Sequence, residues 1–136
     1  MFVSFDYEND RRYKNLLEAW DKNSNFDFVF EDRTSGEIDS DDISRVKAAL
    51  TTKIKSATYT LAIIGEYANE EHEDSEEIGD INWINWEINK SKDENNKIVG
   101  VKIDRSYESP DAILSCGASW AMSFTEDAII KALDNA

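Results

Sequence analysis

One stretch of the sequence, residues 80–91, places a carboxylate among indole rings at helical spacing. Trp83 and Glu87 lie four residues apart, so their side chains are expected to meet on one face of a helix. A preorganised carboxylate can stabilise a developing positive charge, and the indole rings of Trp83 and Trp86 could shield it from water or stack on a ring. The alternative is that both tryptophans pack in the core and Glu87 is solvated.

The helix that would carry these residues is predicted by its apolar period. Ile81, Ile84 and Ile88 recur at i, i+3 and i+7, which indicates one apolar stripe. Asp80 is the expected N-cap, because its carboxylate can accept from the free amides of the first turn.

Strand and helix patterns alternate about five times along the chain. Period-2 or continuous apolar runs predict parallel strands at residues 2–5, 26–30, 59–65, 98–104 and 118–122. Helical stripes follow, the first opening near Asn9 or Asp10, the second at residues 43–54, and the last behind a capping-box spacing of Ser123 and Glu126. The sequence therefore predicts an α/β domain, residues 1–136, with a five-stranded parallel sheet and helices on both faces.

Ligands of such sheets bind beyond the carboxyl ends of the strands. The segments expected there are residues 6–12, 31–40, 66–80 and 104–110. Neither a dinucleotide-binding glycine motif nor a P-loop is present, and the third strand lacks the aspartate of a phosphoreceiver. His72, the only histidine, lies in the acidic run 70–77, which is most simply a solvated, mobile loop. No spacing predicts a metal site.

Composition narrows the classes of partner. The 136 residues carry a formal net charge of −14 with 40% hydrophobic residues, which is typical of a globular protein and argues against nucleic-acid or anionic-membrane partners. Cys116 is the only cysteine, so an intramolecular disulfide is excluded. No apolar run is long enough for a membrane helix and no signal peptide is apparent. A soluble, cytoplasmic protein is expected.

Five blocks of sequence resemble, in order, the TIR-like family of the bacterial Thoeris anti-phage protein ThsB. They are residues 2–11 (FVSFDYENDR), 38–40 (IDS), 83–88 (WINWEI), 100–104 (GVKID) and 117–120 (GASW). The resemblance implies a flavodoxin-like TIR fold and an enzyme that consumes NAD as its substrate, with no other cofactor. Such an enzyme releases nicotinamide and makes an ADP-ribose-derived signal, of the cyclic ADP-ribose type, that a separate effector protein reads.

The resemblance also assigns roles to residues. Glu87 matches the catalytic glutamate of TIR enzymes, and Trp83 matches the aromatic residue that precedes it. The carboxylate would stabilise the oxocarbenium character that develops as the nicotinamide–ribose bond breaks. Nicotinamide leaves as a neutral base, so no general acid is required.

The remaining binding residues are expected around this carboxylate. Phe5 and Asp6 would border the same pocket, and Arg11 and Arg12 at the amino end of the first helix would supply charge and free amides for the pyrophosphate. Arg33 would contribute from a neighbouring subunit, because TIR enzymes resemble one another in completing the site by self-association. Two alternatives stay open: a non-catalytic interaction module that docks through residues 32–39, and a nucleoside-cleaving enzyme of the same fold.

Overall fold

A computed structural model describes residues 1–22 and 42–136. Its sheet has four parallel strands in the order β1 (Phe2–Ser4), β2 (Tyr59–Ile64), β3 (Lys97–Lys102) and β4 (Ser119–Ala121). These are four of the five expected strands, and their bounds lie within two residues of those expected. The fifth, expected at residues 26–30, lies outside the described residues, so the sheet described here has four strands and not five.

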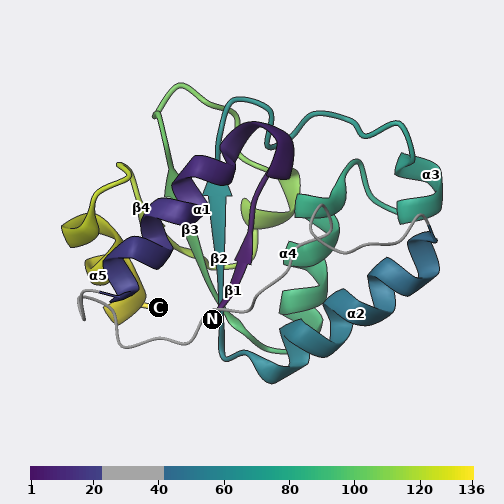
Figure 1. The fold of residues 1–136 in the computed structure, drawn as a ribbon, viewed down its shortest axis with the longest axis horizontal. Helices are drawn as coiled ribbons and strands as arrows, with labels where there is room; N and C mark the ends of the chain where they lie inside the picture. Colours follow the sequence, from purple (N-terminus) through teal and green to yellow (C-terminus); the bar gives the residue numbers. More distant parts are fainter. Residues whose placement is uncertain (23–41) are drawn as a thin grey trace.

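Helices cover both faces of this sheet (Figure 1). They are α1 (Tyr7–Lys22), α2 (Ile43–Ser56), α3 (Ser75–Ile78), α4 (Trp83–Asp93) and α5 (Glu126–Asp134), with a short 3-10 helix at Asp111–Ile113. Figure 1 places α1 and α5 on one side and α2, α3 and α4 on the other. The arrangement is the flavodoxin-like α/β fold that the sequence predicts. None of the helices described is long and apolar enough to cross a bilayer.

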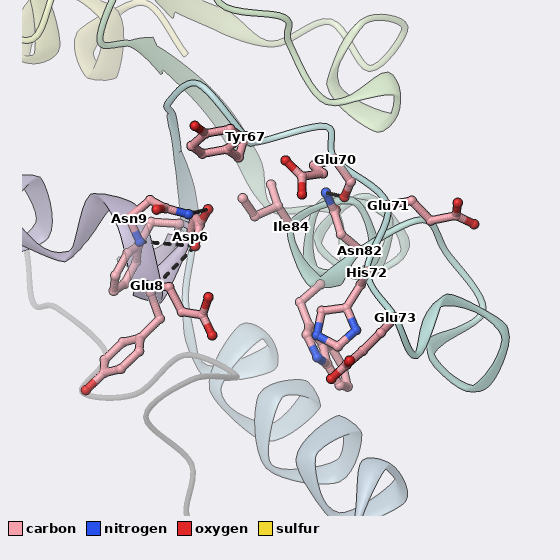
Figure 2. Close-up of a pocket in the computed structure, with 13 residues that line it drawn as sticks. Asp6, Glu8, Asn9, Tyr67, Glu70, Glu71, His72, Glu73, Asn82 and Ile84 are labelled. Carbon is pink, nitrogen blue, oxygen red and sulfur yellow. Dashed lines mark hydrogen bonds between the residues drawn. The ribbon is translucent and has the colours of Figure 1, made fainter.

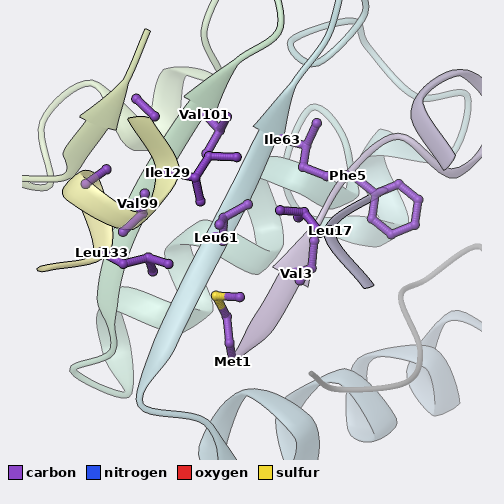
Figure 3. Close-up of a cluster of buried hydrophobic side chains, with 12 residues drawn as sticks. Met1, Val3, Phe5, Leu17, Leu61, Ile63, Val99, Val101, Ile129 and Leu133 are labelled. Atoms are coloured by element: carbon purple, nitrogen blue, oxygen red, sulfur yellow. The ribbon is translucent and has the colours of Figure 1, made fainter. Parts of the chain in front are cut away.

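The central strands are apolar on both faces, and alternate residues of each serve different helices. Leu61 and Ile63 of β2 point into a cluster with α1 and α5, which Figure 3 shows. Ala62 and Ile64 lie in a second cluster with Ile84 and Ile88 of α4 on the opposite face. A parallel strand buried on both sides has this near-continuous apolar pattern, so the strand signal and the layered fold have the same cause.

The same alternation applies to β1. Val3 and Phe5 join the α1 cluster, whereas Phe2 packs against α2. Ser4, two residues after Phe2, therefore faces α4 and is fully buried there. A hydroxyl at this position is available to a polar side chain of α4.

Three helices, α1, α4 and α5, are capped by residues other than those expected. Asp6, rather than Asn9 or Asp10, accepts from the first amides of α1, those of Glu8 at 3.1 Å and Asn9 at 3.3 Å. Residues 9 and 10 are thus inside the helix.

The N-cap of α4 is Asn82, whose side chain accepts from the amide of Asn85 at 2.9 Å. Asp80 is not the cap and instead accepts from the Asn89 side chain at 3.1 Å. At α5 the cap is Thr125, one residue before the helix, in place of the Ser123 box. Short polar residues cluster before each helix, and only the chain path decides which one reaches the free amides.

Gly100 of β3 packs closely against its neighbours. A Cβ atom there would lie 2.9 Å from the Trp120 ring and 2.9 Å from Cδ1 of Ile113. We expect Gly100→Ala to lower the free energy of unfolding by about 1–3 kcal/mol through overpacking, measured by urea denaturation. In the Ile113→Val background, which removes Cδ1, the penalty should shrink. An equal penalty in both backgrounds would contradict the assigned contact.

Candidate functional site

A cavity of about 810 Å³ opens at the edge of the sheet where the strands end. Figure 2 shows residues from the start of α1 on one side and residues 70–73 on the other. The lining residues are Phe5, Asp6, Tyr7, Glu8, Asn9, Tyr67, Glu70, Glu71, His72, Glu73, Asn82, Trp83 and Ile84. Two of the four segments expected to bind ligand, residues 6–12 and 66–80, therefore contribute to it.

The charge of this cavity is strongly negative. Five carboxylates line it, and among the described residues no lysine or arginine does. Such a field attracts a cationic group and repels a phosphate. A ligand with both would therefore place its positive end in this cavity.

The acidic run around His72 is more ordered than a solvated loop. The His72 amide donates to the carbonyl of Ile81 at 2.6 Å, and its Nδ1 accepts from the Asp74 amide at 2.9 Å. The run then forms α3, which buries Ile78. The glutamates of the run are exposed, as expected of a solvated segment, while local hydrogen bonds and the buried Ile78 that follows it anchor its backbone.

Asn82 connects this loop to α4. Its amide nitrogen donates to the carbonyl of Ala68 at 2.8 Å and to that of Glu70 at 2.9 Å, while its oxygen caps the helix. One side chain thereby satisfies two loop carbonyls and one helix amide, and it fixes the cavity wall on the first turn of α4.

Glu87 is completely buried between α4 and β1. The Ser4 hydroxyl donates to its Oε1 at 2.9 Å, and its Oε2 has no hydrogen-bond partner. Burial raises the pKa of Glu87 to about 8, against the lowering effect of the Ser4 hydrogen bond. The alternative that Glu87 is solvated was therefore wrong, and its carboxyl is held mainly in the protonated form at neutral pH.

Glu87 does not line the large cavity. It lies behind the cavity wall: Phe5, the neighbour of Ser4 in the chain, and Trp83, one helical turn before Glu87, are both lining residues. Trp83 makes an edge-to-face contact with Trp86 at a centroid distance of 5.8 Å, and both rings pack beside the α2 cluster. The alternative that both tryptophans pack in the core holds only in part, because both side chains are half-buried; Trp83 lines the cavity and Trp86 does not.

Arg11 and Arg12, which were expected to bind the pyrophosphate, do not line the large cavity. Arg11 donates to the Tyr7 hydroxyl at 3.0 Å and lines neither cavity. Arg12 lines a second, smaller cavity and lies over the Tyr13 ring at 4.9 Å. Both lie beyond the first turn of α1, whose amides already bond to Asp6, so the expected phosphate cradle of free amides does not form there. Arg33 lies outside the described residues.

The smaller cavity, of about 170 Å³, adjoins the larger one, because Asn9 and Tyr67 line both. Asp10 is 6% exposed, and its Oδ2 has no hydrogen-bond partner. Its pKa is raised to about 6, first by burial and then by Asp6, against the effect of Arg12. The carboxyl packs against Gly65, where a Cβ atom would overlap it.

Sequence reasoning missed Ser4, Asp10 as a buried acid, Asn82 and Tyr67. A signal existed only for Ser4: strand alternation places it on the same face as Phe2, toward the helix of Glu87. For Asp10 the burial depends on Gly65, 55 positions along the chain, which no local pattern reveals.

Among the described residues, no group of three His, Cys, Asp or Glu side chains could hold a metal ion.

The buried carboxyl of Glu87 should make stability depend on pH. Its pKa is about 8 in the fold and near 4.5 in the unfolded chain, so the folded state binds the extra proton between these values. The free energy of unfolding should therefore fall as pH rises from about 4.5 to 8, at up to about 1.4 kcal/mol per pH unit. Denaturant titrations should show this decline relative to Glu87→Gln. A constant difference between the two proteins across that range would contradict the assigned burial.

Asn82→Asp keeps the capping oxygen but removes both donated hydrogen bonds. We expect a loss of about 1–3 kcal/mol in stability and faster amide hydrogen exchange across residues 68–73. The matched control is Asn15→Asp on the exposed face of α1, which makes the same chemical change away from the cavity. Equal exchange of residues 68–73 in the two variants would contradict the role given to Asn82.

Comparison with known proteins identifies the family. No curated protein matches the chain. Residues 2–108 match the family model described as "Thoeris protein ThsB, TIR-like domain". The match includes β1, α1, the acidic loop, α4 and β3, and so every residue that lines either cavity. The protein therefore belongs to the TIR-like family of the Thoeris protein ThsB.

Proposed function

We propose that this protein cleaves the nicotinamide–ribose bond of NAD in anti-phage defence, with Glu87 as the catalytic residue. The product would be an ADP-ribose-derived signal, of the cyclic ADP-ribose type, that activates a separate effector protein. In this reaction the bond from the ribose anomeric carbon to the pyridine nitrogen breaks, and its electron pair leaves with neutral nicotinamide. The sugar is then attacked by water or by a nucleophile of the same molecule.

The observation that carries the proposal is the state of the Glu87 carboxyl. It is wholly buried, it has one hydrogen bond, and Oε2 is left without a partner. Burying a carboxyl in this way costs free energy, and a protein that needs only a filled core has no reason to keep one. Strongly perturbed acids of this kind cluster at functional sites. The family resemblance also assigns the role of the TIR glutamate to Glu87, which lies on α4 between β2 and β3.

The electrostatics of the large cavity support the oxidised dinucleotide as substrate. The nicotinamide ring of NAD is cationic, and five carboxylates line the cavity in front of Glu87. The volume of about 810 Å³ falls within the range of about 300–1,000 Å³ usual for ligand sites. The positive ring would bind here, and the pyrophosphate would point away from the acids.

Catalysis requires Glu87 to reach the sugar. Phe5 and Trp83 line the cavity in front of it, so one of these walls must move when the substrate binds or the protein self-associates. A cationic ring next to the carboxyl would lower its pKa and so release the proton. Self-association, with Arg33 contributed by a neighbouring copy, belongs to the proposal.

The test is nicotinamide release from NAD, followed by liquid chromatography and mass spectrometry at high protein concentration or with a crowding agent. Glu87→Gln keeps the shape and removes the charge, and we expect at least a 100-fold loss of rate, the scale of an electrostatic deletion. Because only the ionised carboxylate is active, kcat/KM of the wild-type protein should rise with pH up to about pH 8.

The matched control is Glu94→Gln. Glu94 follows the same helix and pairs with Lys90 at 3.9 Å, so the variant loses the same charge away from the cavity. It should keep the parent rate. If Glu87→Gln does so too, the assignment of Glu87 is wrong. If no assembly condition yields nicotinamide from the wild-type protein, the non-catalytic docking module is the better account.

A further inference from the structure

The smaller cavity contains a second uncompensated acid that the proposed chemistry does not use. Asp10 is more than nine-tenths buried, its Oδ2 has no partner, and it is one of the residues that line this cavity. No cation forms a salt bridge with it among the described residues. A buried carboxylate with few donors is costly. Oδ2 is sealed against Gly65, so a ligand in this cavity would donate to Oδ1, which accepts no hydrogen bond from the described residues.

The Asp10 carboxyl fits in the fold only because residue 65 is a glycine and has no side chain. Gly65 follows β2, and any Cβ atom at this position would overlap the Asp10 carboxyl. Asp10 is therefore seated against backbone at the carboxyl end of the central strands, which is where ligands of parallel sheets bind.

The other lining groups define the chemistry of the ligand. Tyr13, Tyr67 and Tyr107 contribute aromatic rings. Among the residues that the structure describes, Arg12 is the one cation that lines the cavity, and Glu66 is a second acid there. A carboxylate that lacks donors fits two neighbouring hydroxyls, a tyrosine ring fits the apolar face of a sugar, and a guanidinium fits a phosphate. The volume of about 170 Å³ is that of a sugar ring rather than of a whole nucleotide.

We propose that this cavity is a subsite for a ribose, in which the Asp10 carboxylate accepts hydrogen bonds from the vicinal 2′- and 3′-hydroxyls and Arg12 faces the 5′-phosphate. The inference rests on the proposed function, because it assigns the cavity to the adenosine half of NAD. The large cavity would then hold the cationic nicotinamide half. Asn9 and Tyr67, which line both cavities, would lie between the two halves.

The test measures binding, so it does not depend on turnover. Adenosine 5′-monophosphate and its 2′,3′-dideoxy analogue are titrated into the full chain at pH 7.5, by calorimetry or by amide NMR shifts for weak binding. We expect the wild-type protein to bind the monophosphate about 10- to 100-fold more tightly, because two hydrogen bonds to a charged group are lost in the analogue. In Asp10→Asn this preference should fall to about threefold or less.

Asp93→Asn is the control, since it removes one charge from an exposed residue at the end of α4. It should keep the wild-type preference. Asp10→Asn should also be at least as stable as the wild-type protein at pH 7.5, because it removes a buried charge whose pKa is raised. A purely structural Asp10 would instead lose stability when replaced.

Two outcomes overturn the inference. One is a wild-type protein that binds neither nucleotide or binds both equally, and the other is an Asp10→Asn variant that retains the preference. Either result leaves the proposed function standing if nicotinamide release still requires Glu87. Conversely, a ribose preference that depends on Asp10 without any cleavage of NAD would retain the subsite and remove the enzyme.

Discussion

The fold depends on a parallel sheet whose central strands are apolar on both faces. Each face must be covered, so the chain crosses from one side to the other between strands, and every strand ends at the same edge. Strand β2 shows this within a single strand, since one face buries Leu61 and Ile63 and the other buries Ala62 and Ile64. The turns that leave this edge line both cavities together with residues of α1 and α4.

Two carboxyls at this edge contradict the rule that buried charges are paired. Glu87 has a single hydroxyl donor and Asp10 has a carboxyl oxygen without a partner, and burial raises the pKa of both. They lie on different helices and on opposite faces of the sheet, α4 and α1. Two independent violations of polar pairing at one edge are characteristic of a site kept for ligand chemistry rather than for stability.

The negative charge of the protein is also concentrated locally, in the large cavity. The acids of the large cavity come from the start of α1 and from the loop before α4, and Asn82 and His72 hold that loop in place through hydrogen bonds. Within residues 1–22 and 42–136, Arg12 is the only cation that lines either cavity, so the proposed dinucleotide would place its cationic ring among the acids and its phosphates toward Arg12.

Sequence alone determined the class of fold, four of the strands and the family, because strand alternation, apolar runs and motif order are local properties of the chain. It also identified the helix of Glu87 and the pocket residues Phe5, Asp6 and Trp83. Only the tertiary structure decided that Glu87 is buried against Ser4. The packing of Asp10 on Gly65 likewise came from the fold. These contacts join residues 83 and 55 positions apart, and burial depends on which segments the fold brings together rather than on the neighbours of a residue in sequence.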